Sequence, residues 1–168
     1  MSTVLLFAHH LYEDLELWYP NLRLQEAGYK TQIAALEKGE TYNGKHGYPC
    51  KSDLSFKDVQ PSSFAGLVIP GGYAPDHLRR SPQALKIVQE MDKAKKPIAF
   101  ICHAGWVLIS AKILKGRHVT GFSAIQDDLE NAGARYSDQA VVVDGNLISS
   151  RTPADLPEFC KALLKVLG

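Results

Sequence analysis

Short apolar runs alternate along this chain with longer segments in which apolar residues recur every three or four positions. The runs predict buried strands at residues 4–8, 31–36, 66–70, 97–102 and 119–122. The amphipathic segments predict helices at residues 13–27, 82–95, 103–115, 125–131 and 153–166. Residues 141–149, with Asp144-Gly145 between two apolar runs, predict a β-hairpin. Residues 38–59 are polar and contain glycine, which predicts a loop or a hairpin excursion.

The order of these elements predicts the fold class. Strands that alternate with helices favour a parallel sheet covered on both faces, which is an α/β three-layer sandwich. Ligands of such sheets bind beyond the carboxyl ends of the strands. Chemically suggestive residues follow three of the predicted strands, at residues 9–13, 71–76 and 102–103. We therefore expect these three loops to share one rim of the sheet.

Cys102 is the strongest candidate for chemistry. It follows the apolar run from Ile98 to Ile101 and comes before small residues and an amphipathic segment, so it is expected at a sharp strand-to-helix turn. A helix N-terminus favours an anion and can lower a thiol pKa from about 8.5 to roughly 3.5–7.5. A buried structural cysteine is the alternative interpretation. The adjacent His103 favours a nucleophilic thiol.

Two acidic residues after the first strand are candidates to act on that thiol. We expect Glu13 to face Cys102, where a raised pKa would let it hold and shuttle a proton. An ordinary first-turn glutamate, favoured by the helix dipole, is the alternative. Glu16 lies one turn further on, as either a solvated residue or a supporting partner of the site, and we favour the solvated residue.

The remaining candidates are a glycine pair, a histidine and an aspartate. Gly71-Gly72 allows the backbone to approach the thiol, and its N–H groups, with that of His103, are candidates to bind an oxyanion. A plain turn is the alternative for the glycine pair. His103 is the candidate base, and Asp76 is the acid expected to orient it.

Composition narrows the functional classes. The 168 residues predict one domain, residues 1–168, and the formal net charge of +1 gives no support for nucleic-acid or membrane binding. Three widely spaced cysteines fit neither a disulfide framework nor a zinc site, and we expect Cys50 and Cys160 to be structural. His9 and His10 are a poor metal pair that could line the pocket mouth. We find no signal peptide or membrane span, and we expect a cytoplasmic protein without a metal or cofactor.

Four segments taken together resemble the DJ-1/ThiJ/PfpI superfamily, and most closely its PfpI-type intracellular proteases and general stress proteins. They are Glu13-Asp14-Leu15-Glu16, Ile69-Pro70-Gly71-Gly72-Tyr73-Ala74-Pro75-Asp76, Ala99-Phe100-Ile101-Cys102-His103-Ala104-Gly105, and residues 141–155. The resemblance spans essentially the whole chain in order. It implies a flavodoxin-like, glutamine-amidotransferase-like sandwich with Cys102 at a nucleophile elbow and Glu13 against its sulfur. It also implies a homo-oligomer, a dimer or a hexamer, in which Asp76 reaches His103 of a neighbouring subunit.

The resemblance leaves three activities open. The preferred hypothesis is a cysteine-dependent stress enzyme that acts on dicarbonyls such as methylglyoxal or glyoxal and on their protein or nucleotide adducts. The second is an intracellular cysteine peptidase with a Cys-His-acid site at a subunit interface. The third is a redox-sensing or chaperone-like stress protein. The first two add a thiolate to a small carbonyl or peptide substrate, and the third needs only an oxidisable sulfur.

Overall fold

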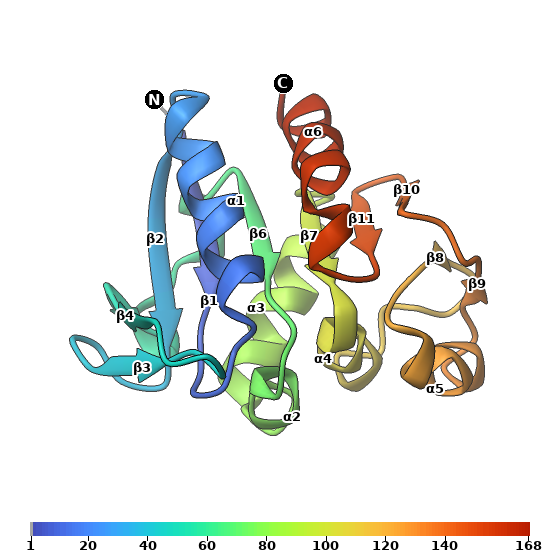
Figure 1. Ribbon diagram of the computed structural model, residues 1–168, viewed down its shortest axis with the longest axis horizontal. Coiled ribbons are helices and arrows are strands. Elements are labelled where there is room, and N and C mark those ends of the chain that lie inside the picture. The colour runs from blue at the N-terminus through green and yellow to red at the C-terminus, as the bar shows by residue number, and fades with distance from the viewer. Residues whose placement is uncertain (1) are drawn as a thin grey trace.

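A seven-stranded, mostly parallel sheet forms the centre of the protein in the computed structural model, which describes residues 2–168 (Figure 1). The strand order is β10-β11-β7-β6-β1-β2-β5, and only the β10–β11 pair is antiparallel. The strands are β1 (Thr3–Phe7), β2 (Lys30–Ala35), β5 (Leu54–Ser55), β6 (Gly66–Ile69), β7 (Ile98–Ile101), β10 (Val141–Asp144) and β11 (Leu147–Ser150). The predicted parallel sheet is confirmed.

Helices cover both faces of this sheet. The long helices α1 (Asp14–Glu26) and α6 (Leu156–Leu167) contact each other and lie side by side on one face, and α3 (Pro82–Lys93) packs behind β7 (Figure 1). Three short helices, α2 (Ala74–Leu78), α4 (Gly105–Ser110) and α5 (Gln126–Asn131), lie toward the carboxyl ends of the strands. The protein is therefore the expected three-layer α/β sandwich.

Two small strand pairs lie outside the main sheet. β3 (Thr41–Asn43) and β4 (Pro49–Lys51) form an antiparallel hairpin, which confirms the excursion predicted at residues 38–59. β8 (His118–Val119) pairs with β9 (Arg135–Tyr136), so the strand predicted at residues 119–122 is shorter and is not part of the main sheet. Short 3-10 turns connect the elements: η1 (Phe56–Asp58), η2 (Pro61–Ser63), η3 (Cys102–Ala104), η4 (Ser123–Ile125) and η5 (Pro153–Asp155).

The helix predicted at residues 103–115 is much shorter than expected. The chain leaves Cys102 as the 3-10 turn η3, and only Gly105–Ser110 is α-helical. Lys112 has a left-handed φ of 60°, which an α-helix does not allow, so the helix ends before it. A short helix carries a weaker dipole effect at the cysteine than the sequence pattern predicted.

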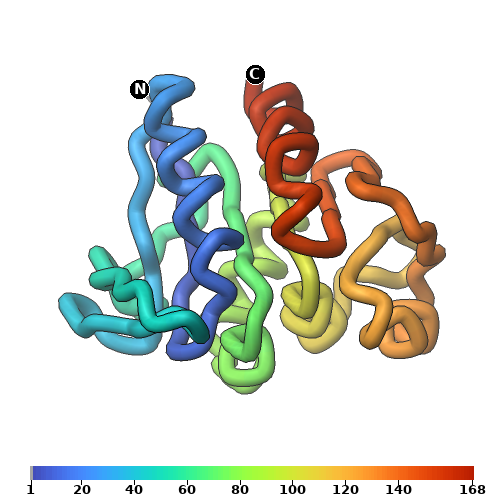
Figure 2. Tube along the Cα trace, viewed as in Figure 1, coloured from blue at the N-terminus to red at the C-terminus, as the bar shows by residue number. Residues whose placement is uncertain are grey.

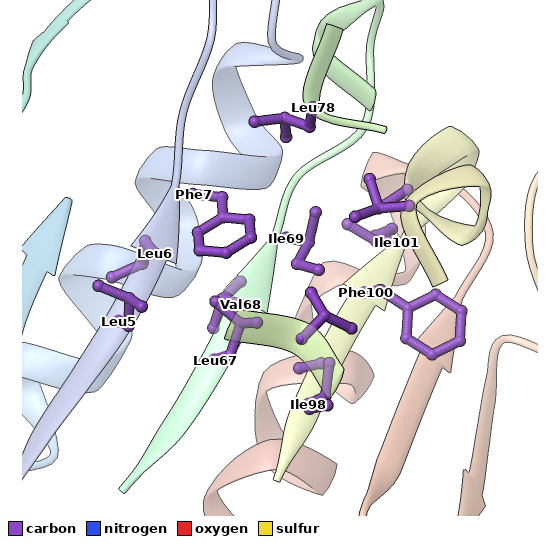
Figure 3. Close-up of a cluster of buried hydrophobic side chains, with 14 of the residues drawn as sticks. Leu5, Leu6, Phe7, Leu67, Val68, Ile69, Leu78, Ile98, Phe100 and Ile101 are labelled. Atoms are coloured by element: carbon purple, nitrogen blue, oxygen red, sulfur yellow. The ribbon is translucent and has the colours of Figure 1, made fainter. Parts of the chain in front are cut away.

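The core lies where β6, β7 and β1 are covered on both faces. Every residue of β6 and β7 is buried, as expected for strands inside a parallel sheet. Figure 3 shows side chains from these strands packed together with Leu78 of α2. In Figure 2 the start of β1 and the last turn of α6 lie at one end of the strands. The carboxyl ends of the strands, which carry the site, lie at the opposite end. This rigid core fixes the positions of the loops that follow β1, β6 and β7.

Candidate active site

The loops after β1 and β6 are hydrogen-bonded to each other through backbone groups. Tyr12 and Gly72 form an isolated antiparallel bridge, and the Tyr73 N–H donates to the Leu11 carbonyl at 2.8 Å. Gly72 has a φ of +74°, and a Cβ there would lie 2.5 Å from the Leu11 oxygen, so this contact requires glycine. Because β7 is the next strand in the sheet, Cys102 lies beside the joined loops. The expected shared rim is confirmed.

Cys102 occupies a strained turn at the end of β7. Its φ is 62°, a left-handed value that costs a non-glycine residue roughly 1–3 kcal/mol. The residue is buried, with 8% of its surface exposed, and its Sγ lies 3.2 Å from Nδ1 of His103. This geometry is that of a nucleophile elbow, in which a sharp turn presents the side chain to a pocket.

Glu16, which we expected to be solvated, is completely buried beside this sulfur. Its Oε2 accepts the Gly71 N–H at 2.7 Å, and its Oε1 is buried without a hydrogen-bond partner among residues 2–168. Burial raises the pKa of Glu16 to about 8, which the Gly71 N–H partly opposes. The prediction of a solvated Glu16 is wrong because helical side chains lean toward the helix N-terminus, which here points the first turn of α1 at the strand ends.

Glu13 does not take the place against the sulfur that the sequence predicted. It is the N-cap of α1, and its Oε2 accepts the Glu16 N–H at 3.0 Å. Its Oε1 lies 3.9 Å from Nε2 of His46. Glu16 occupies the expected position of Glu13, and Glu13 lines the same pocket. A part for Glu13 in the chemistry stays a prediction.

The pKa of the Cys102 thiol is raised, to about 12, and not lowered as the turn predicted. Burial is the largest cause, and the charge of Glu16 adds to it. The N–H groups of Gly72 and His103 and the charge of Lys45 act in the opposite direction. Because the thiol and the carboxyl interact, they lose their protons as a coupled pair. Glu16 has the lower pKa, so the first proton leaves from its carboxyl group at a pH of about 8.

Only part of the predicted oxyanion site is free. The Gly71 N–H is already bound by Glu16, so Gly71 is not an available donor and that expectation is wrong. The N–H groups of Gly72 and His103 favour the ionised sulfur and remain candidate donors. When the sulfur adds to a carbonyl, negative charge develops on the oxygen of the carbon bonded to the sulfur, and these two N–H groups are the candidates to stabilise it.

His103 is placed as a base but has no acid partner within residues 2–168. Burial and the charge of Lys45 lower its pKa, so the ring is neutral near pH 7. The ring stacks on Phe122 with centroids 4.9 Å apart. Asp76, the predicted acid, is half exposed and pairs with Arg80 at 2.8 Å. Contact between Asp76 and His103 of a second subunit stays a prediction.

A pocket with a volume of about 230 Å³ is lined by five of the predicted or reassigned site residues, Glu13, Glu16, Gly72, Cys102 and His103, and not by Gly71 or Asp76. Its walls also include Lys45, Tyr73, Trp106, Phe122, Thr152 and Pro153. Sequence reasoning missed Lys45, which comes from the β3–β4 hairpin. Thr152 and Pro153 were available from the pattern, because they follow β11, another strand of the parallel set.

Other chemically suggestive residues lie outside this pocket. His9 stacks on His77 with centroids 4.2 Å apart, and burial lowers its pKa to about 4. Cys50 and Cys160 are buried, as expected of structural cysteines. Ligand atoms of Glu13, Asp14 and His46 lie within 4.8 Å of one another, but both Asp14 oxygens accept backbone N–H groups at 2.9 Å. Across residues 2–168, no helix has the length and apolar character needed to cross a membrane.

Comparison with known proteins gives consistent results. The sequence model of the DJ-1/PfpI family matches residues 2–166. Deglycase PfpI of Pyrococcus furiosus is 46% identical over 164 residues, which are 98% of each chain. YraA of Bacillus subtilis, named provisionally as a cysteine protease, is 42% identical over 93% of this chain and 92% of its own. A solved two-domain protein from Anabaena variabilis, with DJ-1/ThiJ/PfpI-like and ferritin-like domains, superposes with a TM-score of 0.98 at 41% identity. That match covers 100% of this chain and 48% of the Anabaena chain.

Proposed function

Because the chain belongs to the DJ-1/PfpI family, we propose that it is a cysteine-dependent enzyme that converts small 1,2-dicarbonyls to 2-hydroxy acids. Adducts of these dicarbonyls with amino groups of proteins or nucleotides are the related substrates. The observation that carries the proposal is the buried Glu16 carboxyl, which lines the same pocket as Cys102, has one oxygen without a hydrogen-bond partner among residues 2–168 and has a pKa raised to about 8. A carboxyl with a pKa near the working pH is suited to take and return protons.

The first step is addition of sulfur to the aldehyde carbon. Glu16 in its ionised form takes the thiol proton as the Sγ–C bond forms, so the sulfur need not be ionised beforehand. The carbonyl π-electrons move to oxygen and give a hemithioacetal. In this step the N–H groups of Gly72 and His103, which favour negative charge at the sulfur, stabilise the developing oxyanion.

The second step moves a proton between the two carbons of the substrate. Glu16 returns its first proton to the hemithioacetal oxygen, then removes the hydrogen of the sulfur-bearing carbon as a proton. The former ketone oxygen takes the hydroxyl proton of the sulfur-bearing carbon by way of the enediol, and Glu16 delivers its own proton to the former ketone carbon as the thioester C=O forms. The product is a thioester of a 2-hydroxy acid on Cys102, and water cleaves it to release the acid and the thiol. The net reaction is dicarbonyl plus water to 2-hydroxy acid, with no external oxidant. For an adduct, the Cys102 sulfur bonds to the carbinolamine carbon as the C–N bond breaks, the amine leaves with the proton that Glu16 took from the thiol, and the same hemithioacetal results.

The size of the pocket supports a small substrate. Pockets for drug-sized ligands measure roughly 300–1,000 Å³, and this one measures about 230 Å³. Its aromatic wall, which includes Trp106 and Phe122, helps to exclude water from the hemithioacetal.

The direct experiment is conversion of methylglyoxal to lactate by the purified protein. We expect wild-type turnover and loss of at least about a hundredfold in Cys102→Ala. Cys160→Ala is the matched control, since that thiol is buried on α6 away from the pocket. Equal rates for wild type and Cys102→Ala contradict the proposal.

A cysteine peptidase is the second candidate, and one contact favours it. The Cys102 Sγ and His103 Nδ1 lie 3.2 Å apart, as a nucleophile and its base require. The pair lacks an acid on His103 within residues 2–168, so peptide cleavage requires Asp76 or another carboxylate from a second copy of the chain. Cleavage of a peptide that disappears on dilution to monomers is the result expected of this alternative.

A further inference from the structure

Lys45 reaches the pocket from a loop that is firmly attached to the start of α1. The Lys45 N–H donates to the Tyr12 carbonyl at 2.8 Å. Asp14 accepts the N–H groups of His46 and Tyr48, both at 2.9 Å. Gly44 lies so close to the Asp14 carboxylate that a Cβ there would clash with it. These contacts fix the loop through backbone atoms, so its position does not depend on the Lys45 side chain.

The ammonium group of Lys45 lies near the reacting groups and has no carboxylate partner. Its charge lowers the pKa of Glu16, of Cys102 and of His103. Within residues 2–168, no carboxylate oxygen lies within 4.0 Å of its Nζ, and the Nζ makes no hydrogen bond. A lysine held next to an enclosed site without a partner is available to a ligand.

The other titratable groups of the pocket are either already hydrogen-bonded or uncharged near pH 7. Glu13 caps α1 and accepts the Glu16 N–H. Glu16 keeps its proton below a pH of about 8, and the His103 ring is neutral near pH 7. The facing wall is uncharged: Tyr73, Trp106, Phe122, Thr152 and Pro153. Among the pocket-lining residues of the described chain, Lys45 is thus the one fixed cation.

We infer that Lys45 selects carbonyl substrates that carry a carboxylate in addition to the reacting dicarbonyl group. The inference rests on the proposed function and names the substrate class of the same site. The ammonium group donates to the carboxylate, and the neutral facing wall offers no competing charge. Lys45 is a specificity-determining residue in this account and takes no part in the proton transfers.

The first test compares two substrates with the same reacting group, 4-carboxyphenylglyoxal and phenylglyoxal. For wild type we expect a ratio of kcat/KM that favours the carboxylated substrate, and a fall of that ratio by about tenfold in Lys45→Met. Lys45→Arg keeps the charge and is expected to retain most of the preference. Lys38→Met removes an exposed lysine that does not line the pocket and is the matched control. An unchanged ratio in Lys45→Met overturns the inference.

The second test measures binding without turnover. Calorimetry with 4-(hydroxymethyl)benzoate and with benzyl alcohol is expected to show tighter binding of the carboxylate, lost by about tenfold in Lys45→Met. If wild type turns over neither glyoxal but keeps this binding preference, the proposed function fails and the anion site stands. If the glyoxals are turned over and the carboxylate has no binding or kinetic preference, the inference about Lys45 fails and the proposed function stands.

Discussion

The Glu16 carboxylate and the Cys102 side chain both lie against the Cα of Gly71. A Cβ at position 71 would lie 2.5 Å from Oε2 of Glu16 and 2.7 Å from Cβ of Cys102. The absence of a side chain at this position therefore allows the carboxyl and the thiol to approach each other. The Gly71 N–H also binds the carboxylate at 2.7 Å, so one residue both spaces and holds the pair.

Gly71→Ala is expected to separate this pair. The new methyl group must displace the Glu16 carboxylate, the Cys102 side chain or the Ile101 carbonyl. We expect a loss of about 1–3 kcal/mol in the free energy of unfolding from overpacking, and a fall in kcat of about a hundredfold. Urea denaturation and methylglyoxal turnover measure the two effects. Gly28→Ala is the control: nothing lies within 4 Å of its Cβ, although its φ is +88°, so it should lower stability and leave kcat intact. Equal effects of the two substitutions on kcat would refute the spacing role.

Glu16→Gln and Glu13→Gln distinguish the two glutamates. Glu16→Gln removes the group that takes the thiol proton, and we expect kcat to fall by roughly 10²–10⁴-fold. Glu13→Gln keeps an oxygen that can accept the Glu16 N–H, so we expect less than about a tenfold loss. Steady-state kinetics on methylglyoxal gives both values. The reverse order of the two losses would return the catalytic role to Glu13.

Stability is expected to fall as the pH rises toward 8. The pKa of Glu16 is raised on folding from 4.5 to about 8, so the native state binds this proton more tightly than the unfolded state. The contribution is fully present below the unfolded pKa and is lost as the pH passes through the folded pKa. The slope from this one group is at most about 1.4 kcal/mol per pH unit. Urea unfolding between pH 5 and 8 should show this decline in wild type and a flatter profile in Glu16→Gln. Parallel profiles for the two proteins would mean that Glu16 titrates normally.

Asp76→Ala distinguishes between the two proposed activities, dicarbonyl turnover and peptide cleavage. In this chain Asp76 pairs with Arg80 at the surface and has no contact with His103. Dicarbonyl turnover by Cys102 and Glu16 is therefore expected to stay within about twofold of wild type. Peptide cleavage, if present, should be lost together with the acid. Assays of both substrates on the same preparation, at several protein concentrations, make the comparison. Loss of dicarbonyl turnover in Asp76→Ala would place this acid in the main reaction.

The sequence predicted the strand ends that form the rim of the site better than the arrangement of side chains within it. The apolar runs of β1, β6 and β7 gave the strand ends, and with them the shared rim that brings Gly72 to Cys102. The local sequence pattern could not predict which of Glu13 and Glu16 lies beside Cys102. It depends on the bridge from Tyr12 to Gly72, which sets the direction in which α1 begins.

Two further features depend on contacts that are distant in sequence. Lys45 enters the pocket only because Asp14 holds the β3–β4 loop, and no local signal marks that contact. The raised pKa of Cys102 follows from burial and from Glu16, neither of which the strand-to-helix pattern contains. A pattern can thus predict a turn and a thiol, but the ionisation of the thiol depends on the groups packed around it.

The ionisation of Cys102 itself tests the central claim most directly. The rate of iodoacetamide alkylation at Cys102, followed by peptide-resolved mass spectrometry across a pH series, reports its pKa. The account predicts a wild-type thiol that ionises well above the value of about 8.5 for free cysteine, and a lower pKa in Glu16→Gln, where the opposing charge is gone. A wild-type pKa at or below that of free cysteine, unchanged by Glu16→Gln, would show that the two groups are not coupled and would contradict the account.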